Sequence, residues 1–304
     1  MPELPEVTVI VNSLNRKIKG LEFKSVEYDW AKKFDWGHRP GGPSGSEGNF
    51  SARDLKGVKI KKVDRRGKVV LIETDGGFTI LIHLKLTGQL IYLDKKTRIA
   101  GGHPIPPLNL PVPNKTTRAT FEFTNGGHLY FNDMRKFGWV KIVSSDKGQV
   151  SSAIGTLGPD ALEITYKQFS ERLKSKGNWR IKKLLMDQTF VSGIGNIYSD
   201  EALWRAKVHP SRTVLSLTPI EIKAIFDGVK DSLKLAIEKG GSSANSFVDS
   251  GGEKGLYLSF ANAYHMTGRP CKRCKTPIAR KKMDGRSAHF CPNCQKANGP
   301  GFDF

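Results

Sequence analysis

The sequence is poor in cysteine and has no long hydrophobic run. Its 304 residues include only four cysteines, all of which lie between positions 271 and 294. Secreted domains held together by disulfides use cysteine more densely, so this distribution argues against that class. No apolar stretch approaches the roughly 18 residues that a membrane-spanning helix needs. Glu3 and Glu6 stand where a signal peptide has a basic and then an apolar segment. We therefore expect a cytoplasmic protein with no membrane partner.

Acidic residues are also scarce relative to basic ones. There are 29 Asp and Glu against 49 Lys and Arg, which gives a formal net charge of +20 and an isoelectric point near 9.8. Such an excess favours a polyanionic partner, most often nucleic acid, over a charge kept only for solubility. The hydrophobic content of 38% is that of a globular protein, and the length suggests two or three domains.

The first half of the chain predicts a helix followed by β-structure. A helix is expected from Pro5 to a stop at Gly20, because apolar residues recur at helical spacing between them. The segments 69–84 and 118–133 each consist of two β-rich runs around a turn, at Asp75-Gly76 and Asn125-Gly126. Two such hairpins beside further strands indicate a β-sandwich. The segments 37–49 and 103–115 are expected to be loops, because they are rich in Gly and Pro respectively.

The second half is expected to be helical. Capping boxes at 165–168 and 218–221 predict two helix starts, and a Gly-rich turn runs into a third helix within 191–206. The segment 240–255 is expected to be a flexible loop. The predicted fold class is α+β with three domains: a β-sandwich domain at 1–148, a helical domain at 149–262, and a zinc finger with a tail at 263–304.

The cysteines form the pattern C-x₂-C-x₁₆-C-x₂-C, which predicts a zinc site. The pattern comprises Cys271, Cys274, Cys291 and Cys294. Four thiolates leave no open coordination position, so we expect one structural zinc ion and no catalytic metal. Between the pairs, Asp284-Gly285 predicts a hairpin turn with Arg286 directly after it, a suitable place for a phosphate contact.

The first residues, Pro2 and Glu3, also suggest chemistry. If Met1 is removed, Pro2 becomes a secondary amine, which can attack an aldehyde-like carbon and form an iminium ion. Glu3 beside it could donate a proton. The alternative is that Pro2 and Pro5 shape the entry into the helix while the glutamates complement its dipole.

Several motifs occur along the chain in this order: PELPEV at the N-terminus, RRGK (65–68), HLKLTG (83–88), DMRKFG (133–138), LGPDAL (157–162), LLMDQ and VSGIGNIYSDEALWRAKVHP (184–210), and the four-cysteine finger. Their order and residue types resemble those of the formamidopyrimidine-DNA glycosylase family, the Fpg/Nei group of base-excision repair enzymes. The resemblance implies an N-terminal helix with a β-sandwich, a helix–two-turn–helix domain and a zinc-finger hairpin, with DNA bound between the domains. It implies a bifunctional DNA glycosylase/AP lyase that acts on oxidised purines, such as 8-oxoguanine and formamidopyrimidines, and on abasic sites in double-stranded DNA.

The resemblance also implies catalytic roles for four residues. Pro2 matches the nucleophile that attacks the sugar C1′ and forms a Schiff base, and Glu3 matches the acid that protonates the ring oxygen. Lys68 matches the lysine of the β-elimination step. Arg286 matches the arginine that grips phosphate beside the lesion and takes part in δ-elimination.

Four further residues match positions that bind the DNA. Asn196 corresponds to a phosphate-binding asparagine. Leu86, Arg135 and Phe137 correspond to residues that fill the gap left by the flipped nucleotide. A base cannot react inside the stack, and an apolar wedge, an aromatic ring and an arginine can replace its stacking and pairing.

The chain departs from the family pattern at four positions. Leu86 stands where the family often has Met, and Thr116 where many members have a His. Met134 and Lys136 differ from the common D-P-R-R-F-G. These differences affect local contacts and leave the residues of the proposed chemistry intact.

Two other functions remain open at this stage. An endonuclease VIII-like relative would prefer oxidised pyrimidines, but that branch usually has Gly at the position of Leu4. A non-catalytic zinc-finger DNA-binding protein would not need Pro2, Glu3 and Lys68. We expect a monomer that is nucleoid-associated if the source is bacterial.

Overall fold

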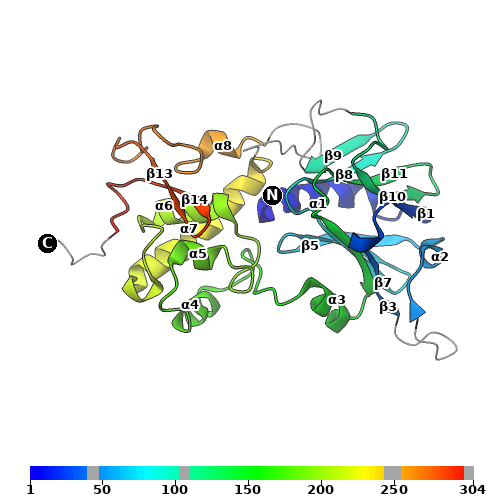
Figure 1. Cartoon of the computed structure of the whole chain (residues 1–304), viewed down its shortest axis with the longest axis horizontal. Helices are drawn as coiled ribbons and strands as arrows, with labels where there is room; N and C mark the ends of the chain where they lie inside the picture. Colours follow the sequence, from blue (N-terminus) through cyan, green and yellow to red (C-terminus); the bar gives the residue numbers. More distant parts are fainter. Residues whose placement is uncertain (40–47, 103–109, 243–254, 298–304) are drawn as a thin grey trace. The chain divides into compact units, whose positions relative to one another are not determined.

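The computed structural model describes residues 1–39, 48–102, 110–242 and 255–297. It contains two compact units (Figure 1). The first comprises Met1–Thr156 with Gly240–Gly255, and the second comprises Leu157–Lys239 with Leu256–Phe304. Most of the expected loop residues in 37–49, 103–115 and 240–255 lie outside the described ranges. Within those ranges, no helix has the length and apolar character needed to cross a membrane.

The first unit is the predicted β-sandwich with an N-terminal helix. One sheet has the order β1 (Phe23–Tyr28), β10 (Thr117–Phe123), β11 (His128–Asp133), β8 (Gly88–Leu93) and β9 (Arg98–Gly102). The other has the order β2 (Phe34–Trp36), β12 (Trp139–Ser144), β7 (Phe78–His83), β6 (Val69–Thr74) and β5 (Ile60–Arg66). Neighbouring strands are antiparallel except β2 and β12, which are parallel.

The core of this unit lies between the two sheets and α1 (Leu4–Ile18). The apolar stripe that predicted α1 is buried from Val7 to Ile18, in one cluster with side chains of both sheets. At its centre the rings of Phe23 and Phe123 lie 5.2 Å apart. A single apolar face therefore joins the N-terminal helix to the sandwich and holds the start of the chain on it.

Both predicted hairpins are confirmed. β6 and β7 are joined at residues 75–77, and β10 and β11 at 124–127. Gly77 and Gly126 have φ values of 76° and 81°, which a residue with a Cβ adopts only with strain. Shorter elements complete the unit: η1 (Ala31–Lys33), β3 (His38–Arg39), β4 (Gly48–Asn49), α2 (Ala52–Leu55) and α3 (Lys147–Ile154).

The second unit contains the predicted helices and the zinc-finger hairpin. Its elements are α4 (Tyr166–Lys174), α5 (Ile181–Leu185), α6 (Asn196–Ala206), η2 (Val214–Ser216), α7 (Pro219–Glu238), α8 (Tyr257–Phe260), β13 (Ala279–Met283) and β14 (Arg286–Phe290). The capping boxes expected before α4 and α7 are present. The predicted α+β fold class, with sandwich, helical region and cysteine-bearing hairpin, is confirmed.

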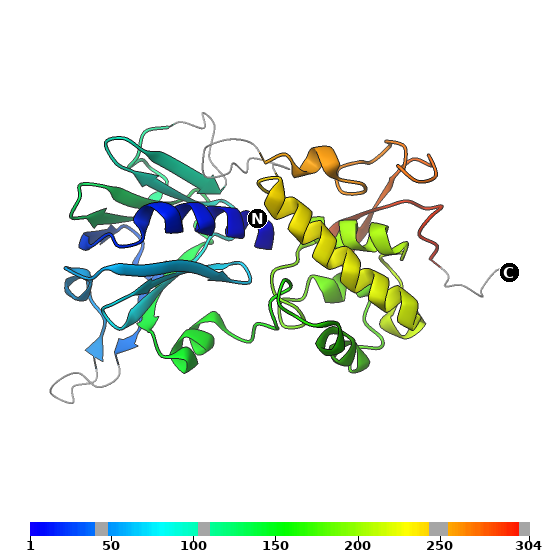
Figure 2. The same cartoon turned by 180° about the vertical axis from the view of Figure 1, so that it is seen from behind.

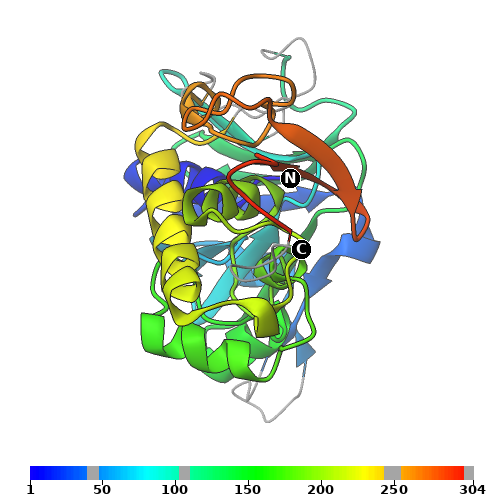
Figure 3. The same cartoon turned by 90° about the vertical axis from the view of Figure 1, so that its left-hand side faces the viewer.

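The long helix α7 packs along α6 (Figures 2 and 3). A Cβ on Gly228 of α7 would lie 2.7 Å from the carbonyl oxygen of Ala202 in α6, so only glycine allows this approach. β13 and β14 pair from Ala279 with Phe290 to Met283 with Arg286. Helix α6 also packs against β14, so this helix supports the hairpin.

Candidate active site and metal centre

The head of α1 presents the first two candidate residues. Pro2 is buried, whereas Met1 is 40% exposed. Glu3 is the N-cap of α1 and only 4% exposed. Its backbone N–H donates to Glu6 Oε2 at 2.8 Å, as part of a reciprocal capping box with Glu6. The capping box orders the first turn of α1. Pro2 therefore lies directly before an ordered segment, although it is next to the end of the chain.

The capping glutamate Glu6 also holds a distant segment. Its Oε1 accepts the backbone N–H of Ser242 at 2.8 Å. Each carboxylate oxygen therefore binds a backbone N–H of a different segment, and the start of the 240–255 loop is tied to the head of α1. The sequence predicted a dipole role for Glu6 but missed this contact, because nothing local signals a partner 236 residues away.

Lys68 lies in a tight turn that is joined to the same helix. Gly67 and Lys68 connect β5 to β6, and Gly67 has a φ of 57°. Next to the turn, Arg65 Nε donates to the hydroxyl of Thr8 in α1 at 2.6 Å. Lys68 is 4% exposed. A lysine kept from bulk water on an anchored turn is suited to proton transfer or to a specific phosphate contact.

His83 lies beside the turn of Lys68 and was given no role in the prediction from sequence. It pairs with Val69, directly after Lys68, in the β6–β7 ladder. Burial lowers the pKa of His83 to about 3, with the charges of Lys85 and Lys68 adding to the effect. Its Nδ1 accepts the Lys85 backbone N–H at 3.0 Å, so the neutral ring carries its proton on Nε2. The only sequence signal was its position at the head of HLKLTG.

The predicted gap-filling residues lie on two turns of this unit. Leu86 is half-buried on the turn between β7 and β8. Arg135 and Phe137 are exposed on the turn between β11 and β12, with the guanidinium 4.8 Å from the ring centroid. Phe137 is 47% exposed, so it is not an ordinary residue of the sandwich core.

Two of the residues that depart from the family pattern, Lys136 and Thr116, have local partners. Lys136 places its Nζ 5.5 Å from the ring centroid of Trp30. Thr116 is buried, and its hydroxyl donates to Asn114 Oδ1 at 2.7 Å. Met134 is exposed beside Arg135. Thr116 therefore has a structural role in its own loop.

In the second unit, Asn196 is the first residue of α6, after the Gly-rich turn. Its Oδ1 is buried, with no hydrogen-bond partner among the described residues. The amide of Gln188 holds the turn, because its Oε1 accepts the Gly193 N–H at 3.0 Å and its Nε2 donates to the Ile194 carbonyl at 2.7 Å. The N-terminal end of a helix carries a partial positive charge and attracts an anion such as phosphate. Gln188, quoted in LLMDQ but given no role, was missed.

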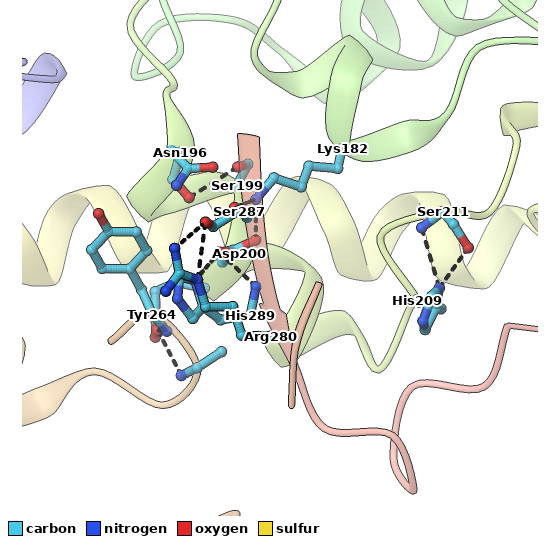
Figure 4. A network of polar contacts seen from close by, with 12 residues as sticks. Lys182, Asn196, Ser199, Asp200, His209, Ser211, Tyr264, Arg280, Ser287 and His289 are labelled. Carbon is cyan, nitrogen blue, oxygen red and sulfur yellow. Dashed lines mark hydrogen bonds and ion pairs between the residues drawn. The ribbon is translucent and has the colours of Figure 1, made fainter. Parts of the chain in front are cut away.

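A buried ionic network supports the hairpin that carries Arg286 (Figure 4). Lys182 of α5 donates to Asp200 Oδ1 at 2.5 Å and to the Ser287 carbonyl at 2.8 Å. Asp200 Oδ2 accepts the backbone N–H of His289 at 3.0 Å and lies 2.9 Å from its Nδ1. The network ties α5 and α6 to β14, and Arg286 stands exposed at the first position of that strand.

The four cysteines meet the requirements of a tetrahedral zinc site. All four Sγ atoms lie within 4.8 Å of one another. Four sulfurs at the usual Zn–S distance of about 2.3 Å would be about 3.8 Å apart, so the cluster fits one ion after a small contraction. Cys271 and Cys291 are buried against Trp204 of α6, and Arg273 lies 3.9 Å over the Trp204 ring. The metal centre is therefore built onto the end of α6.

The candidate residues are divided between the units. Pro2, Glu3, Lys68, Leu86, Arg135 and Phe137 belong to the first unit, and Asn196, Arg286 and the four cysteines belong to the second. Within the first unit, α1 and the turn of Lys68 are joined by the Arg65–Thr8 hydrogen bond.

The zinc site predicts different behaviour for two variants. Cys291→Ser should lose stoichiometric zinc, because the hairpin is too small to fold without the metal, which contributes on the order of 10–16 kcal/mol at such sites. Arg286→Ala should keep the zinc, because Arg286 is exposed and not a ligand. Metal content is measured on both purified proteins. Full zinc occupancy in Cys291→Ser, or zinc loss in Arg286→Ala, would contradict the assigned ligand set.

The pKa of His83 predicts a pH effect on stability. The unfolded chain has a histidine pKa near 6.5 and binds more protons than the folded chain between pH 6.5 and about 3. The free energy of unfolding should therefore fall as the pH is lowered through this window. His83→Gln, which does not titrate, should lose less stability on acidification. Denaturant unfolding at several pH values tests this, and equal slopes for both proteins would show that His83 is not held neutral.

The sequence and structure are similar to those of known proteins along nearly the whole chain. Residues 1–140 match the formamidopyrimidine-DNA glycosylase N-terminal domain, residues 157–248 the H2TH domain, and residues 268–297 a zinc finger found in FPG and IleRS. The formamidopyrimidine-DNA glycosylases of Pelotomaculum thermopropionicum and Solibacter usitatus are 39% and 37% identical to it over 297 and 300 residues. Each alignment covers 97% of this chain. The same alignments cover 99% and 100% of the lengths of the two relatives.

Solved structures give the same result. A complex between the Lactococcus lactis Fpg and an abasic site containing DNA matches with a TM-score of 0.80 at 30% identity, covering 97% of this chain and 99% of that one. A Lactococcus lactis FPG mutant bound to a Fapy-dG containing DNA matches equally well, covering 97% and 100%. Identity above 30% over the full length, together with three matching domains in the same order, shows that the chain belongs to the formamidopyrimidine-DNA glycosylase family.

Proposed function

We propose that this protein excises oxidised purines from double-stranded DNA and then nicks the strand, with Pro2 as the nucleophile. The observation that carries the proposal is the head of α1, where Pro2 is buried beside the N-cap Glu3 in a chain that matches a glycosylase family over its full length. Family membership supports the reaction class, and the local geometry supports the residue roles.

The nucleophile requires removal of Met1. In the encoded chain the Pro2 nitrogen is an amide and cannot attack carbon. Once Met1 is removed, the lone pair of the Pro2 nitrogen can form a bond to the sugar C1′ while the bond from C1′ to the base breaks, and the departing base takes up the proton that the nitrogen loses. The nitrogen lone pair then forms a C=N bond as the bond from C1′ to the ring oxygen breaks, which gives an iminium ion between Pro2 and C1′.

Glu3 and Lys68 are placed to move protons in these steps. Glu3 supplies the proton that the sugar ring oxygen takes up as the ring opens. Lys68 acts in the elimination that follows, in which a proton leaves C2′ and the 3′ phosphate departs. Both side chains are almost fully buried, and low exposure strengthens their interaction with charge that develops nearby.

The second unit supplies phosphate contacts to the lesion strand. Asn196 is the first residue of α6, and the positive end of a helix dipole favours an anion. Arg286 is an exposed guanidinium on a hairpin fixed by the Asp200 network, a geometry suited to a charge-assisted contact. The net charge of +20 adds attraction that does not depend on sequence and would favour association with the nucleoid of a bacterial cell.

Leu86, Arg135 and Phe137 fill the gap in the duplex when the damaged nucleotide is flipped out. Flipping costs a few kcal/mol, and side chains that replace the lost stacking offset part of that cost. The exposure of Arg135 and Phe137 and their mutual contact suit this role.

The purine preference rests on the family match and on Leu4. Relatives of this chain carry the name formamidopyrimidine-DNA glycosylase, and one solved relative is a complex with Fapy-dG. The endonuclease VIII-like branch usually has Gly where this chain has Leu4, a fully buried residue. Duplexes that contain 8-oxoguanine or 5-hydroxycytosine separate the two functions, because faster excision of the pyrimidine would contradict the proposal.

Borohydride trapping tests covalent catalysis by Pro2. It reduces an iminium ion to a stable amine, so the wild-type protein should become linked to 8-oxoguanine DNA, and Pro2→Gly should be trapped far less. Pro5→Ala is the matched control, because it changes a proline of the same turn that has no proposed chemical role. Trapping of Pro2→Gly at the wild-type level would contradict the assignment of Pro2 as the nucleophile. If the wild-type protein does not nick the DNA, only a DNA-binding role remains.

Glu3→Gln should abolish base excision while DNA affinity stays within about twofold of wild type. The change removes a proton donor and keeps the size of the side chain, and no phosphate contact is assigned to it. Single-turnover excision and an equilibrium binding titration are measured on the same 8-oxoguanine duplex. Wild-type excision by Glu3→Gln would refute the acid role, and lost binding would indicate damage to the capping box instead.

A further inference from the structure

The two turns that carry the gap-filling residues are joined by one buried carboxylate. Asp133, at the end of β11, is 1% exposed. Its Oδ1 accepts the hydroxyl of Thr87 and the backbone N–H of Arg135, the latter at 3.2 Å. Its Oδ2 accepts the backbone N–H of Gly138 at 2.7 Å. Thr87 follows Leu86 on one turn, while Arg135 and Gly138 lie on the other.

The hydroxyl of Thr87, on the first turn, forms two hydrogen bonds that link it to the second turn. It donates to Asp133 and also accepts the Arg135 N–H at 3.1 Å. The β8–β11 ladder places Gly88 opposite Asp133, so the end of the first turn lies beside the start of the second. A Cβ on Gly138 would lie 2.9 Å from the His83 carbonyl oxygen and 3.1 Å from Asp133 Oδ2, which shows how closely the second turn approaches the first.

Each turn contains a lysine in the left-handed conformation directly before a gap-filling residue. Lys85 has a φ of 49° and precedes Leu86, and Lys136 has a φ of 56° and precedes Phe137. Non-glycine residues rarely adopt this conformation, and it persists where surrounding contacts hold it. The Lys85 N–H is held by His83 Nδ1, and Asp133 holds the backbone N–H groups on both sides of Lys136, those of Arg135 and Gly138.

Further contacts fix the backbone of Asp133. The Asp133 carbonyl accepts Arg118 Nε at 2.9 Å, and Arg118 also forms an ion pair with Asp29 at 2.7 Å. The Asp133 N–H donates to the Thr116 carbonyl at 2.8 Å. The Asp133 carboxylate therefore has a fixed position, and both turns are hydrogen-bonded to it.

We propose that Thr87 and Asp133 are positioning residues for base extrusion. They hold the two turns as one body, so that Leu86 enters the duplex together with Arg135 and Phe137. This inference rests on the proposed function, in which those three side chains fill the gap. Thr87 touches no reacting atom and acts through the turns that it joins.

The test compares Thr87→Val, which has the same shape but no hydroxyl, with Thr87→Ser, which keeps the hydroxyl. A hydrogen bond to a charged group contributes about tenfold or more to an equilibrium. Thr87→Val should therefore excise 8-oxoguanine from a duplex about tenfold more slowly in single turnover. Nicking of a preformed abasic site, which needs no extrusion of a stacked base, should change by less than about twofold. Thr87→Ser should match the wild type on both substrates.

A double-mutant cycle separates positioning from folding. If Thr87 acts by presenting Leu86, Thr87→Val should cost clearly less in a Leu86→Ala background than in the wild type, whereas independent effects would add. A 2-aminopurine beside the lesion reports extrusion directly, and its fluorescence rise should be slower in Thr87→Val.

The outcomes distinguish this inference from the proposed function. A wild-type protein that does not excise 8-oxoguanine contradicts the proposed function and leaves the inference without a basis. An active wild type with Thr87→Val equal to it overturns the inference alone. Equal losses by Thr87→Val on both substrates, or additive effects in the cycle, also overturn it, because they indicate a general role in stability.

Discussion

The capping box between Glu3 and Glu6 is the constraint on which the proposed chemistry depends. A nucleophile next to the chain terminus must be ordered, and terminal residues are usually mobile. Here the Glu3 N–H is bound by Glu6, the first turn of α1 is capped, and the apolar face of α1 is buried in the sandwich. The same carboxylate binds Ser242, so the order of the first turn extends to the segment after α7.

Buried carboxylates repeat this arrangement at three other places. Asp133 joins the two turns of the gap-filling residues, Asp200 joins α6 to β14, and Glu201 binds the backbone N–H groups of Ala263 and Tyr264. Asp200 and Glu201 accept backbone N–H groups of segments distant in sequence, whereas Asp133 accepts two N–H groups of one turn and the Thr87 hydroxyl of the other. A buried charge is costly unless it is paired and hydrogen-bonded, so the chain segments around it have few alternative positions. The candidate residues therefore lie close to backbone groups that these carboxylates hold in place.

Local patterns in the sequence predicted most of the architecture. Asp75-Gly76 and Asn125-Gly126 predicted the hairpins, because their turns need residues that tolerate positive φ. Thr165 and Thr218 predicted two helix starts, because a capping box is complete within four residues. The cysteine spacing predicted the metal centre, because the type and spacing of the ligands determine which metal a site binds and with what geometry.

The contacts of the site that span long sequence separations could not be predicted from such patterns. The Glu6–Ser242 and Asp200–His289 contacts join residues that only the folded chain brings together. The low pKa of His83 was not predicted because it follows from burial and from the charges of Lys85 and of Lys68, which lies on the turn before a neighbouring strand, and the burial and the approach of Lys68 are not visible in a single run of sequence. Resemblance to a family supplied the roles of Lys68, Asn196 and Arg286, which the residue types alone did not determine.

The most direct measurement is the identity of the atom that becomes linked to DNA. The protein is trapped with borohydride on an 8-oxoguanine duplex, digested, and its DNA-bearing peptide is sequenced by mass spectrometry. Our account predicts that the sugar remnant is on the nitrogen of Pro2 in a peptide that lacks Met1. A remnant on a lysine side chain, or on a peptide that still begins with Met1, would contradict it.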